Sequence, residues 1–477
     1  MLESLSQTRD TLINKLTIRS YLAREYSLIL MRQGSESGLF YHIVKGMLFL
    51  AVLGLPASGL VFRDGLSPAA NTRTAPTGDY AGSGWQHQLR YLTSHATIIS
   101  PKHFITATHL GANQEQVTQQ AFFNGVGLKT FAIKGTPVRI GDSDLRVFEI
   151  WETFDSYALL YTKSNEVGKE MVVHGRGIDR DEEVLGRGWK WGAYTTQKSR
   201  WGRNEVGGSV EIEGNELLHF DFSDVFGEDE AIVSPRDSGG GWFIKDGPIW
   251  KLAAVTFSVD ASYSSSAIPS NQNSFNGAFY DAGGLHIGSD DSGWNLIPMG
   301  GESENPSDMR FYRQTNGYGS RISDCAEEIQ ALIDPAIEWK DLSPAEKFNN
   351  WLEESGISLS GFSDDPDNDG FSNLEEYLVG SNPSDASKGT GPMTIDYLPD
   401  GSHSFVLVES LDLEGRHLTT VLESSADLNN WAPVGDLTQI SSVRDNPAGV
   451  QTRSLTRTPE QNGSLFYRLR ITMGVLN

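Results

Sequence analysis

Short apolar runs dominate the sequence between about residues 86 and 320, and glycine, asparagine or aspartate interrupts them every few residues. The clearest runs are rich in β-branched and aromatic residues and cover 96–100, 104–108, 145–151, 242–245 and 250–257. Runs of this length are too short for ordinary helices, whereas they match strands bounded by turn residues. The sequence therefore predicts an antiparallel β-barrel or sandwich for this part of the chain.

The chain has 477 residues, which is enough for two or three domains. Residues 60–85 are rich in Gly, Ser, Pro, Thr and Asn and predict a loose N-terminal extension. A main β domain is expected over 86–338 and a helical linker over 339–390. From residue 391 the pattern is again that of strands, so we predict a small β-sandwich over 391–477.

Two helix starts stand out where the β pattern ends. Asp324 and Glu327 form a capping pattern, and apolar residues on one face extend the predicted helix to Ile333. The run 343–346, Ser-Pro-Ala-Glu, combines a capping serine, a proline at the first helical position and a glutamate that completes a capping box. A third, short helix is expected over 373–378.

The net charge is −24, from 38 basic and 62 acidic residues. A chain this acidic repels a phosphate backbone, so we expect no nucleic-acid partner. The charge fits a secreted protein or one that binds divalent cations, and a well-solvated surface explains it equally well. The chain has one cysteine, Cys325, so it cannot form an internal disulfide.

Residues 1–59 are expected to hold a targeting signal. The apolar run Met47–Leu55 follows Lys45 and precedes small residues suited to signal peptidase, which is the layout of a secretory signal. The long segment before the run indicates an extended signal or a true start at Met31 or nearby. A buried core helix and a retained membrane anchor are the alternatives. The prediction is a secreted, extracellular or periplasmic protein.

Three segments bring together the residue types of nucleophilic catalysis, in the order His109, Asp144 and Ser238. A serine hydroxyl is a poor nucleophile unless an imidazole takes its proton, and a carboxylate must orient that imidazole. His109 ends a predicted strand and Asp144 leads another. Asp142 competes for the acid role, but Asp144 is favoured because it directly precedes the strand. Taken singly, Asp-Ser-Gly-Gly is a common loop and His109 an ordinary polar residue.

These motifs resemble the trypsin- and chymotrypsin-like serine proteases. The resemblance rests on Thr-Ala-Thr-His at 106–109, Asp-Leu at 144–145 and Asp-Ser-Gly-Gly at 237–240, and covers about residues 86–335. It implies a chymotrypsin-like double β-barrel over 86–338. It also implies a serine endopeptidase that hydrolyses protein or peptide substrates through an acyl-enzyme, with no cofactor for catalysis.

The same resemblance assigns the backbone N–H groups of Arg236 and Ser238 to the oxyanion hole. The family has glycine where this chain has Arg236, so we expect the hole to be impaired or to form only with substrate. The family's activation sequence, Ile-Val-Gly-Gly, is absent, so Asp237 needs another partner. The specificity pocket maps to Ile232, Phe257 and Val259, which favours small or medium apolar residues. A catalytically impaired, protease-like binding protein is the first alternative function.

An acidic loop in the linker predicts a calcium site. It resembles the twelve-residue loop of EF-hands and, more closely, of thrombospondin type 3 repeats. Carboxylate and carbonyl oxygens at this spacing suit calcium, which takes about six to eight hard oxygen ligands. The alternative is a solvated acidic linker. The predicted ligands are Asp365, Asp367, Asp369, the carbonyl of Phe371, Asn373 through water, and Glu376. The calcium is expected to be structural.

The C-terminal segments 423–431 and 466–470 resemble the small β domains that end many secreted bacterial proteins. The resemblance implies surface attachment, sorting or ligand binding. The aromatic residues here are expected to be core residues, with a carbohydrate platform as the alternative. A calcium-stabilised cell-surface adhesion protein is therefore the second alternative function.

Overall fold

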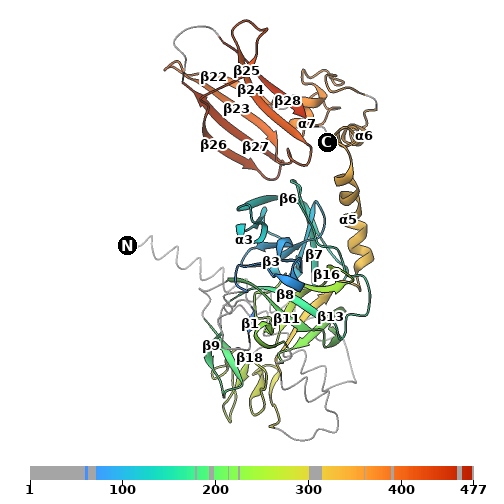
Figure 1. The fold of residues 1–477 in the computed structure, drawn as a ribbon, viewed down its shortest axis with the longest axis vertical. Coiled ribbons are helices and arrows are strands. Elements are labelled where there is room, and N and C mark those ends of the chain that lie inside the picture. Colours follow the sequence, from blue (N-terminus) through green and yellow to red (C-terminus); the bar gives the residue numbers. More distant parts are fainter. Residues whose placement is uncertain are drawn as a thin grey trace, which may run out of the picture.

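The computed structural model describes residues 60–62, 71–177, 180–192, 198–212, 214–223, 226–260, 262–299, 314–358, 360–387, 391–458 and 465–474. The β-rich main domain and the C-terminal sandwich lie at opposite ends of an elongated molecule, and helix α5 connects them (Figure 1). The predicted targeting region 1–59 lies outside the described residues. Within the described ranges, no helix combines the length and apolar character needed to cross a membrane.

Six antiparallel strands close into a barrel that forms the first half of the main domain. Alternate side chains point into this barrel, as the two-residue period of a strand requires. Leu89, Ile98, Phe104 and Phe148 are buried there, and the last two rings stack with centroids 4.9 Å apart. In barrel order the strands are β2 (Gln88–Tyr91), β3 (Ser94–Ile98), β4 (His103–Ala107), β7 (Leu145–Ile150), β6 (Lys129–Arg139) and β5 (Gln116–Gln119).

The second half of the main domain is a seven-stranded antiparallel sheet rather than a second closed barrel. The Asn204 side chain on β11 donates to the carbonyl of Asp221 at the end of β13, at 2.9 Å, and so links two strands that are not neighbours in the sheet. In sheet order the strands are β11 (Lys198–Glu205), β8 (Glu170–Gly177), β15 (Gly241–Asp246), β16 (Ile249–Val259), β21 (Asn316–Arg321), β13 (Asn215–Asp221) and β12 (Gly208–Ile212). The expected mostly-β fold is confirmed, and one of the two expected barrels is closed.

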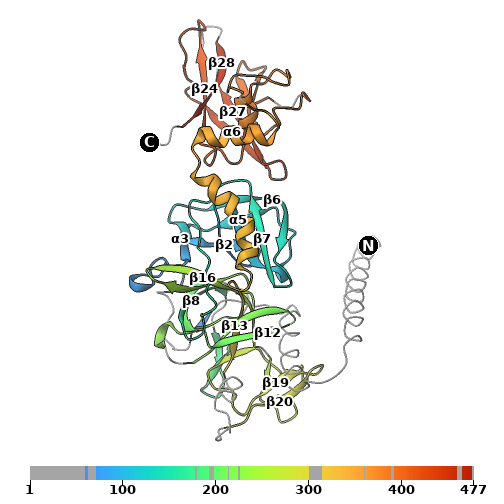
Figure 2. The same cartoon turned by 90° about the vertical axis from the view of Figure 1, so that its right-hand side faces the viewer.

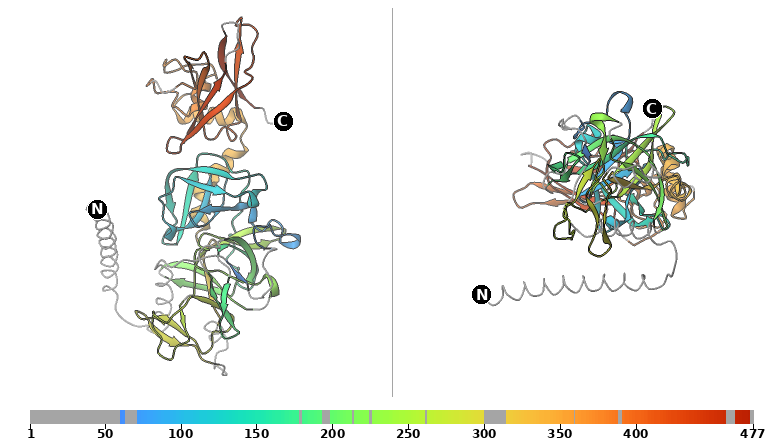
Figure 3. Two further views of the ribbon diagram at one scale, coloured as in Figure 1. Left: turned by 90° about the vertical axis from the view of Figure 1, so that its left-hand side faces the viewer. Right: turned by 90° about the horizontal axis from the view of Figure 1, so that it is seen from below.

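Two small three-stranded sheets form an insertion that the sequence analysis did not predict. The insertion, drawn in green to yellow, lies at the end of the molecule opposite the C-terminal sandwich (Figure 3). Its own core contains Tyr263, Phe279, Leu285 and Ile287. One sheet has the order β18 (Gly277–Phe279), β10 (Gly188–Trp191) and β9 (Arg180–Glu183), and the other β17 (Tyr263–Ser264), β19 (His286–Ser289) and β20 (Gly293–Leu296).

The described parts of the N-terminal extension are packed, so the expectation of a loose segment is wrong for them. Strand β1 (Val61–Phe62) pairs with β14 (Ala231–Ile232), and Leu60, Val61 and Phe62 are all less than 5% exposed. Their apolar side chains supply burial that outweighs the Gly- and Ser-rich composition around them. Trp85, at the end of the extension, is also buried.

Helix α5 (Ala326–Asp341) is longer than predicted and crosses the expected boundary at residue 338. Cys325, not Asp324, is its N-cap, and it provides no side-chain cap. The helix continues past Ile333 because Ala336 is also buried, and Pro335 is accommodated within it. Figure 2 shows α5 lying along the barrel.

The other helices follow the prediction closely. Helix α6 (Pro344–Glu354) begins with the predicted capping box, in which Glu346 N donates to Ser343 Oγ and Ser343 N donates to the Glu346 carboxylate. Helix α7 spans Asn373–Val379. A single turn of helix, α3 (Ala121–Asn124), lies beside the barrel.

The C-terminal module is the predicted β-sandwich. Phe405, Leu407, Leu422 and Leu455 form its core, together with partly buried side chains that include Tyr467. One sheet has the order β22 (Met393–Tyr397), β23 (His403–Ser410), β27 (Val450–Arg457) and β26 (Thr438–Asp445), and the other β25 (Ala432–Pro433), β24 (Leu418–Ser425) and β28 (Phe466–Met473). Of the aromatic residues in the two segments 423–431 and 466–470, Tyr467 packs against this core, whereas Trp431 is half-buried and Phe466 is 45% exposed. The core interpretation therefore holds for Tyr467 and is wrong for Phe466.

Candidate active site

The structure brings His109, Asp144 and Ser238 together. Strands β4 and β7 pair with Ala107 opposite Leu145, which places the residues just beyond these strand ends side by side. His109 Nδ1 lies 2.6 Å from Asp144 Oδ2, the His109 N–H donates to Asp144 Oδ1 at 2.9 Å, and His109 Nε2 lies 2.8 Å from Ser238 Oγ. The carboxylate therefore fixes both the backbone and the ring of His109.

Asp142, the competing candidate, does not reach His109. It is exposed, and its carbonyl accepts a hydrogen bond from the Arg139 guanidinium at 2.8 Å. The two-residue offset matters because Asp144 directly precedes β7, whereas Asp142 lies in the turn before it. The geometry selects Asp144 as the partner of the imidazole.

The approach to the site is open on the His109 side. The His109 side chain is 34% exposed, and the Phe257 ring meets its ring edge-on with centroids 5.9 Å apart. Ser238 is only 8% exposed. A substrate can therefore reach the imidazole, while the serine is held in a defined position.

The loop that carries Ser238 is fixed by backbone hydrogen bonds on both sides. His95 N donates to the Ser238 carbonyl at 3.1 Å, Gly239 N to Thr256 O at 3.1 Å, and Gly240 N to Asp237 O at 2.9 Å. A side chain at Gly239 would place its Cβ 1.9 Å from the His95 carbonyl oxygen, and Gly239 has a φ of +82°. This close approach explains why glycine follows the serine.

The Asp237 side chain also holds this loop in place through hydrogen bonds. It is fully buried, and its carboxylate accepts hydrogen bonds from Ser234 N at 2.8 Å and Arg176 N at 2.7 Å. Burial raises the pKa of this carboxyl to about 7, and the two amides and the nearby Arg200 guanidinium only partly oppose the shift. The partner that the sequence analysis required is thus found in backbone amides, which no sequence pattern identifies.

Arg236 occupies the left-handed region, with a φ of +76°. A non-glycine residue there costs about 1–2 kcal/mol, and such strain persists only where the surroundings enforce it. The arginine therefore adopts a conformation that glycine would take at no steric cost. The hydrogen bonds of Asp237 and Gly239 supply the necessary constraint on the following residues.

The three predicted pocket residues do not share one environment. Ile232 is completely buried and pairs with Val61 on β1. Val259 lies in the same core cluster and is 3% exposed, whereas Phe257 contacts the His109 ring. Of the three, Phe257 alone contacts the triad.

The acidic loop folds so that its aspartates converge. Carboxylate oxygens of Asp365, Asp367 and Asp369 lie within 4.8 Å of one another. The loop turns at Gly370, which has a φ of +100° and donates its N–H to Asp365 Oδ2 at 3.0 Å. Phe371 N donates to Asp369 Oδ1 at 2.8 Å, so the chain at Phe371 closes around the cluster.

A cation fits this donor set. One oxygen in each of four side chains is buried without a hydrogen-bond partner: Asp365 Oδ1, Asp367 Oδ2, Asn373 Oδ1 and Glu376 Oε2. Burial raises the pKa of Glu376 to about 7, and the three aspartates add to the shift. Buried oxygens without a partner are costly, and hard oxygen donors at this spacing suit calcium.

Comparisons with known proteins identify no family for this chain. No family model matches it, and no curated protein matches it. Many solved structures align, and two of them are the inactive form of a serine-to-alanine mutant of Rv3671c from M. tuberculosis and the inactive form of the Rv3671c protease. The first is 12% identical over 53% of this chain and 88% of its own, with a TM-score of 0.27. The second is 14% identical over 52% and 87%, with a TM-score of 0.26. At these TM-scores nothing about this chain is inferred from the alignments.

Proposed function

We propose that this protein is a serine endopeptidase with His109, Asp144 and Ser238 as its catalytic triad. The observation that carries the proposal is the unbroken chain of contacts from the Asp144 carboxylate through the His109 ring to Ser238 Oγ, with links of 2.6 and 2.8 Å. Nucleophile and base lie within the range required for proton transfer, and a third group orients the base.

In the proposed reaction, Ser238 Oγ attacks the carbonyl carbon of a peptide bond while His109 Nε2 takes the hydroxyl proton. Asp144 holds His109 so that Nδ1 carries its proton and Nε2 is the acceptor, and it stabilises the imidazolium that forms. His109 then gives the proton to the leaving amine, which breaks the peptide bond and leaves an acyl ester on Ser238. Water, activated by His109, hydrolyses this ester and restores the serine.

The oxyanion that forms during attack is assigned to the N–H groups of Arg236 and Ser238. Donors for an oxyanion are effective when they are held in place before the reaction. The hydrogen bonds at Ser238 O, Gly239 N and Asp237 support this preorganisation. The φ of +76° at Arg236 supports the same loop conformation without a glycine.

We also propose that the Asp365–Glu376 loop holds a structural calcium ion. Asp365, Asp367, Asp369 and Glu376 would supply carboxylate oxygens, with the Phe371 carbonyl and the Asn373 side chain completing the ligands. The bound cation would neutralise the carboxylates that converge there. The ion plays no part in the peptide hydrolysis proposed above, which uses only the triad and the oxyanion hole.

We propose that the protein acts outside the cytoplasm. A secretory signal within residues 1–59 would place the protein outside the cytoplasm or in the periplasm, where calcium and protein substrates are available. The C-terminal sandwich would provide cell-surface attachment. Small or medium apolar residues are the proposed cleavage preference.

The experiment that tests the proposed activity compares hydrolysis of a quenched fluorescent casein by the protein and by its Ser238→Ala variant. The parent should release fluorescence, and the variant should lose several orders of magnitude in rate. Equal rates for the two proteins would remove Ser238 from the mechanism. If neither the parent nor the Ser238→Ala variant hydrolyses casein, the result would favour a protease-like binding protein as the function.

A further inference from the structure

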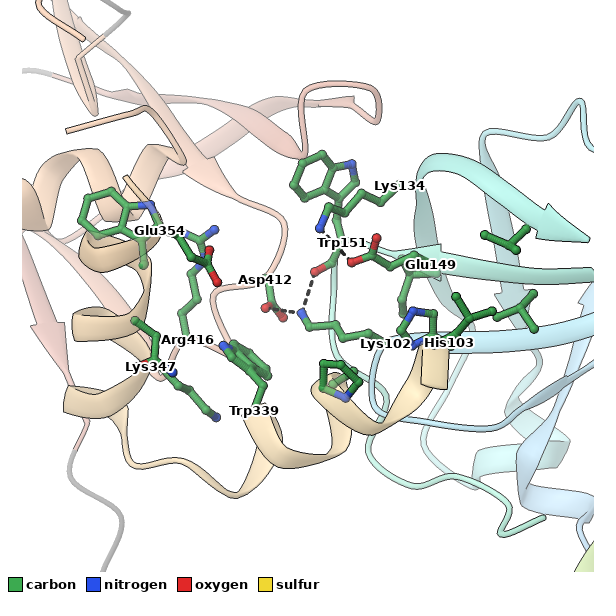
Figure 4. Close-up of a pocket in the computed structure, with 18 of the residues that line it drawn as sticks. Lys102, His103, Lys134, Glu149, Trp151, Trp339, Lys347, Glu354, Asp412 and Arg416 are labelled. Carbon is green, nitrogen blue, oxygen red and sulfur yellow. Dashed lines mark hydrogen bonds and ion pairs between the residues drawn. The ribbon is translucent and has the colours of Figure 1, made fainter. Parts of the chain in front are cut away.

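A cavity of about 510 Å³ lies between the barrel, helices α5 and α6, and the C-terminal sandwich. Its volume is within the range of sites that bind small molecules. Aromatic side chains from the end of β7 and from helices α5, α6 and α7 line it, namely Trp151, Trp339, Trp351 and Tyr377. Figure 4 shows Lys102, Asp412 and Trp339 meeting where the parts join. The cavity is separate from the triad.

The walls of this interdomain cavity are held by contacts between domains. Lys102 Nζ, on the barrel, lies 2.5 Å from Asp412 Oδ2 on the sandwich and donates to the Trp151 carbonyl at 2.8 Å. Thr153 Oγ1 also donates to Asp412, at 2.9 Å. The Asp412 side chain is only 6% exposed, and these two contacts fix the position of its carboxylate. These contacts hold the walls of the cavity in fixed positions.

Lys347, on α6, carries a buried charge without a carboxylate partner. The residue is 3% exposed, and its ammonium group donates only to the neutral Gly415 carbonyl at 3.1 Å and to His417 Nε2 at 3.3 Å. The pKa of Lys347 is lowered, first by burial and then by Lys102 and Lys340, although the carboxylates of Asp412 and Asp341 partly oppose the shift. A buried ammonium is costly unless an anion compensates it.

The surroundings of Lys347 carry further positive charge. The ammonium groups of Lys102 and Lys347 lie 4.5 and 4.3 Å from the centre of the Trp339 ring. The Arg416 guanidinium lies 4.6 Å from the centre of the Tyr377 ring. The other lining acids do not offset Lys347, because Glu149 pairs with Lys134 at 2.7 Å and Glu354 is exposed. In a chain of net charge −24, this local excess of cations points to an anionic ligand.

We propose that the interdomain cavity binds an organic carboxylate with an aromatic or apolar body. The carboxylate pairs with Lys347, and the body lies against the indole rings of Trp339 and Trp351. A free small acid and the C-terminal residue of a peptide share this chemistry. The site does not depend on the activity of Ser238.

The test measures binding by calorimetry in the full chain carrying Ser238→Ala, so that the protein cannot cleave itself or a peptide. Indole-3-acetate is the small-acid probe, and indole-3-acetamide is its uncharged match. An acetylated tripeptide ending in tryptophan, as the free acid and as the amide, represents a peptide terminus. Each acid–amide pair differs only in the charge that Lys347 is proposed to recognise.

At least one acid should bind about tenfold or more tightly than its amide, the difference expected for a charged hydrogen bond. The tighter of the two acids identifies the source of the ligand. Lys347→Met, which keeps the apolar stem against Trp339, should abolish the difference. Lys190→Met, on an exposed lysine of the insertion, should leave it unchanged.

A second pair of variants tests the site without removing a buried group. Asn350 lies exposed on α6 and lines the cavity. Asn350→Asp should weaken binding of the acid several-fold by repulsion, while Asn350→Ser should not. The proposal is overturned if neither acid shows saturable binding at millimolar concentrations, or if acid and amide bind equally to the parent.

Discussion

His174 should make the main domain sensitive to acid. It is completely buried on β8, where Nε2 pairs with the Ser83 carbonyl at 2.8 Å. Burial lowers its pKa from 6.5 to about 4, so the folded protein holds the ring neutral. A group with a lowered pKa in the folded state stabilises the fold fully above pH 6.5, and this contribution is lost as the pH falls toward 4.

The size of the effect follows from the shift. A difference of about 2.5 pKa units corresponds to ~3 kcal/mol at 1.36 kcal/mol per unit. This is a large share of the stability of an ordinary domain. A Cβ on Gly240 would lie 2.0 Å from the His174 carbonyl oxygen, so β8 packs directly against the loop that carries Ser238. Protonation of His174 should therefore disturb the triad as the domain loosens.

The assay is urea unfolding of the Ser238→Ala protein between pH 7.5 and 4.5, compared with the same protein carrying His174→Gln. Glutamine can still donate to Ser83 but does not titrate. The stability of the variant relative to the parent should rise by most of ~3 kcal/mol toward the acid end. His286→Gln, on the partly exposed strand β19, is the matched control and should follow the parent. Parallel profiles for the parent and His174→Gln would refute the reasoning.

Three further changes test other parts of the account. Asp144→Asn should lower kcat by about 10⁴, by favouring the wrong tautomer of His109, whereas Asp142→Asn should leave peptide hydrolysis unchanged. Arg236→Gly should keep or raise kcat, and a steep loss of activity would show that the arginine side chain is used. The same change should alter the unfolding free energy by less than ~1 kcal/mol, because relief of the left-handed strain offsets the added entropy of the unfolded chain. Removing calcium should lower the melting temperature and expose residues 340–390 to trypsin. Turnover of a small peptide should stay nearly unchanged. Identical digestion with and without calcium would exclude the metal.

Sequence patterns predicted the parts of the fold that depend on local rules. The capping box at Ser343, the short helix that begins at Asn373 and the strand that ends at Ala107, two residues before His109, each follow from residues close in the chain. The order of His109, Asp144 and Ser238 gave the candidate site because each residue lies at the end of a recognisable strand or loop.

Long-range pairing explains what the sequence patterns missed. The strands of the insertion have only two to four residues each, and β10 pairs with β18, which is distant in the sequence. Leu60–Phe62 appeared to belong to a loose extension because its partner, Ala231–Ile232, is distant in sequence. The amides that hold Asp237, the φ of Arg236 and the burial of Lys347 are likewise properties of assembled elements.

The central claim is that the serine of this site is activated. It is tested most directly by treating the purified protein with a fluorophosphonate probe and locating the label by peptide mass spectrometry. Covalent labelling requires both an activated hydroxyl and a usable oxyanion hole. The account predicts one label, on Ser238, which is absent from Ser238→Ala and strongly reduced in Asp144→Asn. No label on a folded parent protein, or a label of equal intensity on Ser238→Ala, would contradict it.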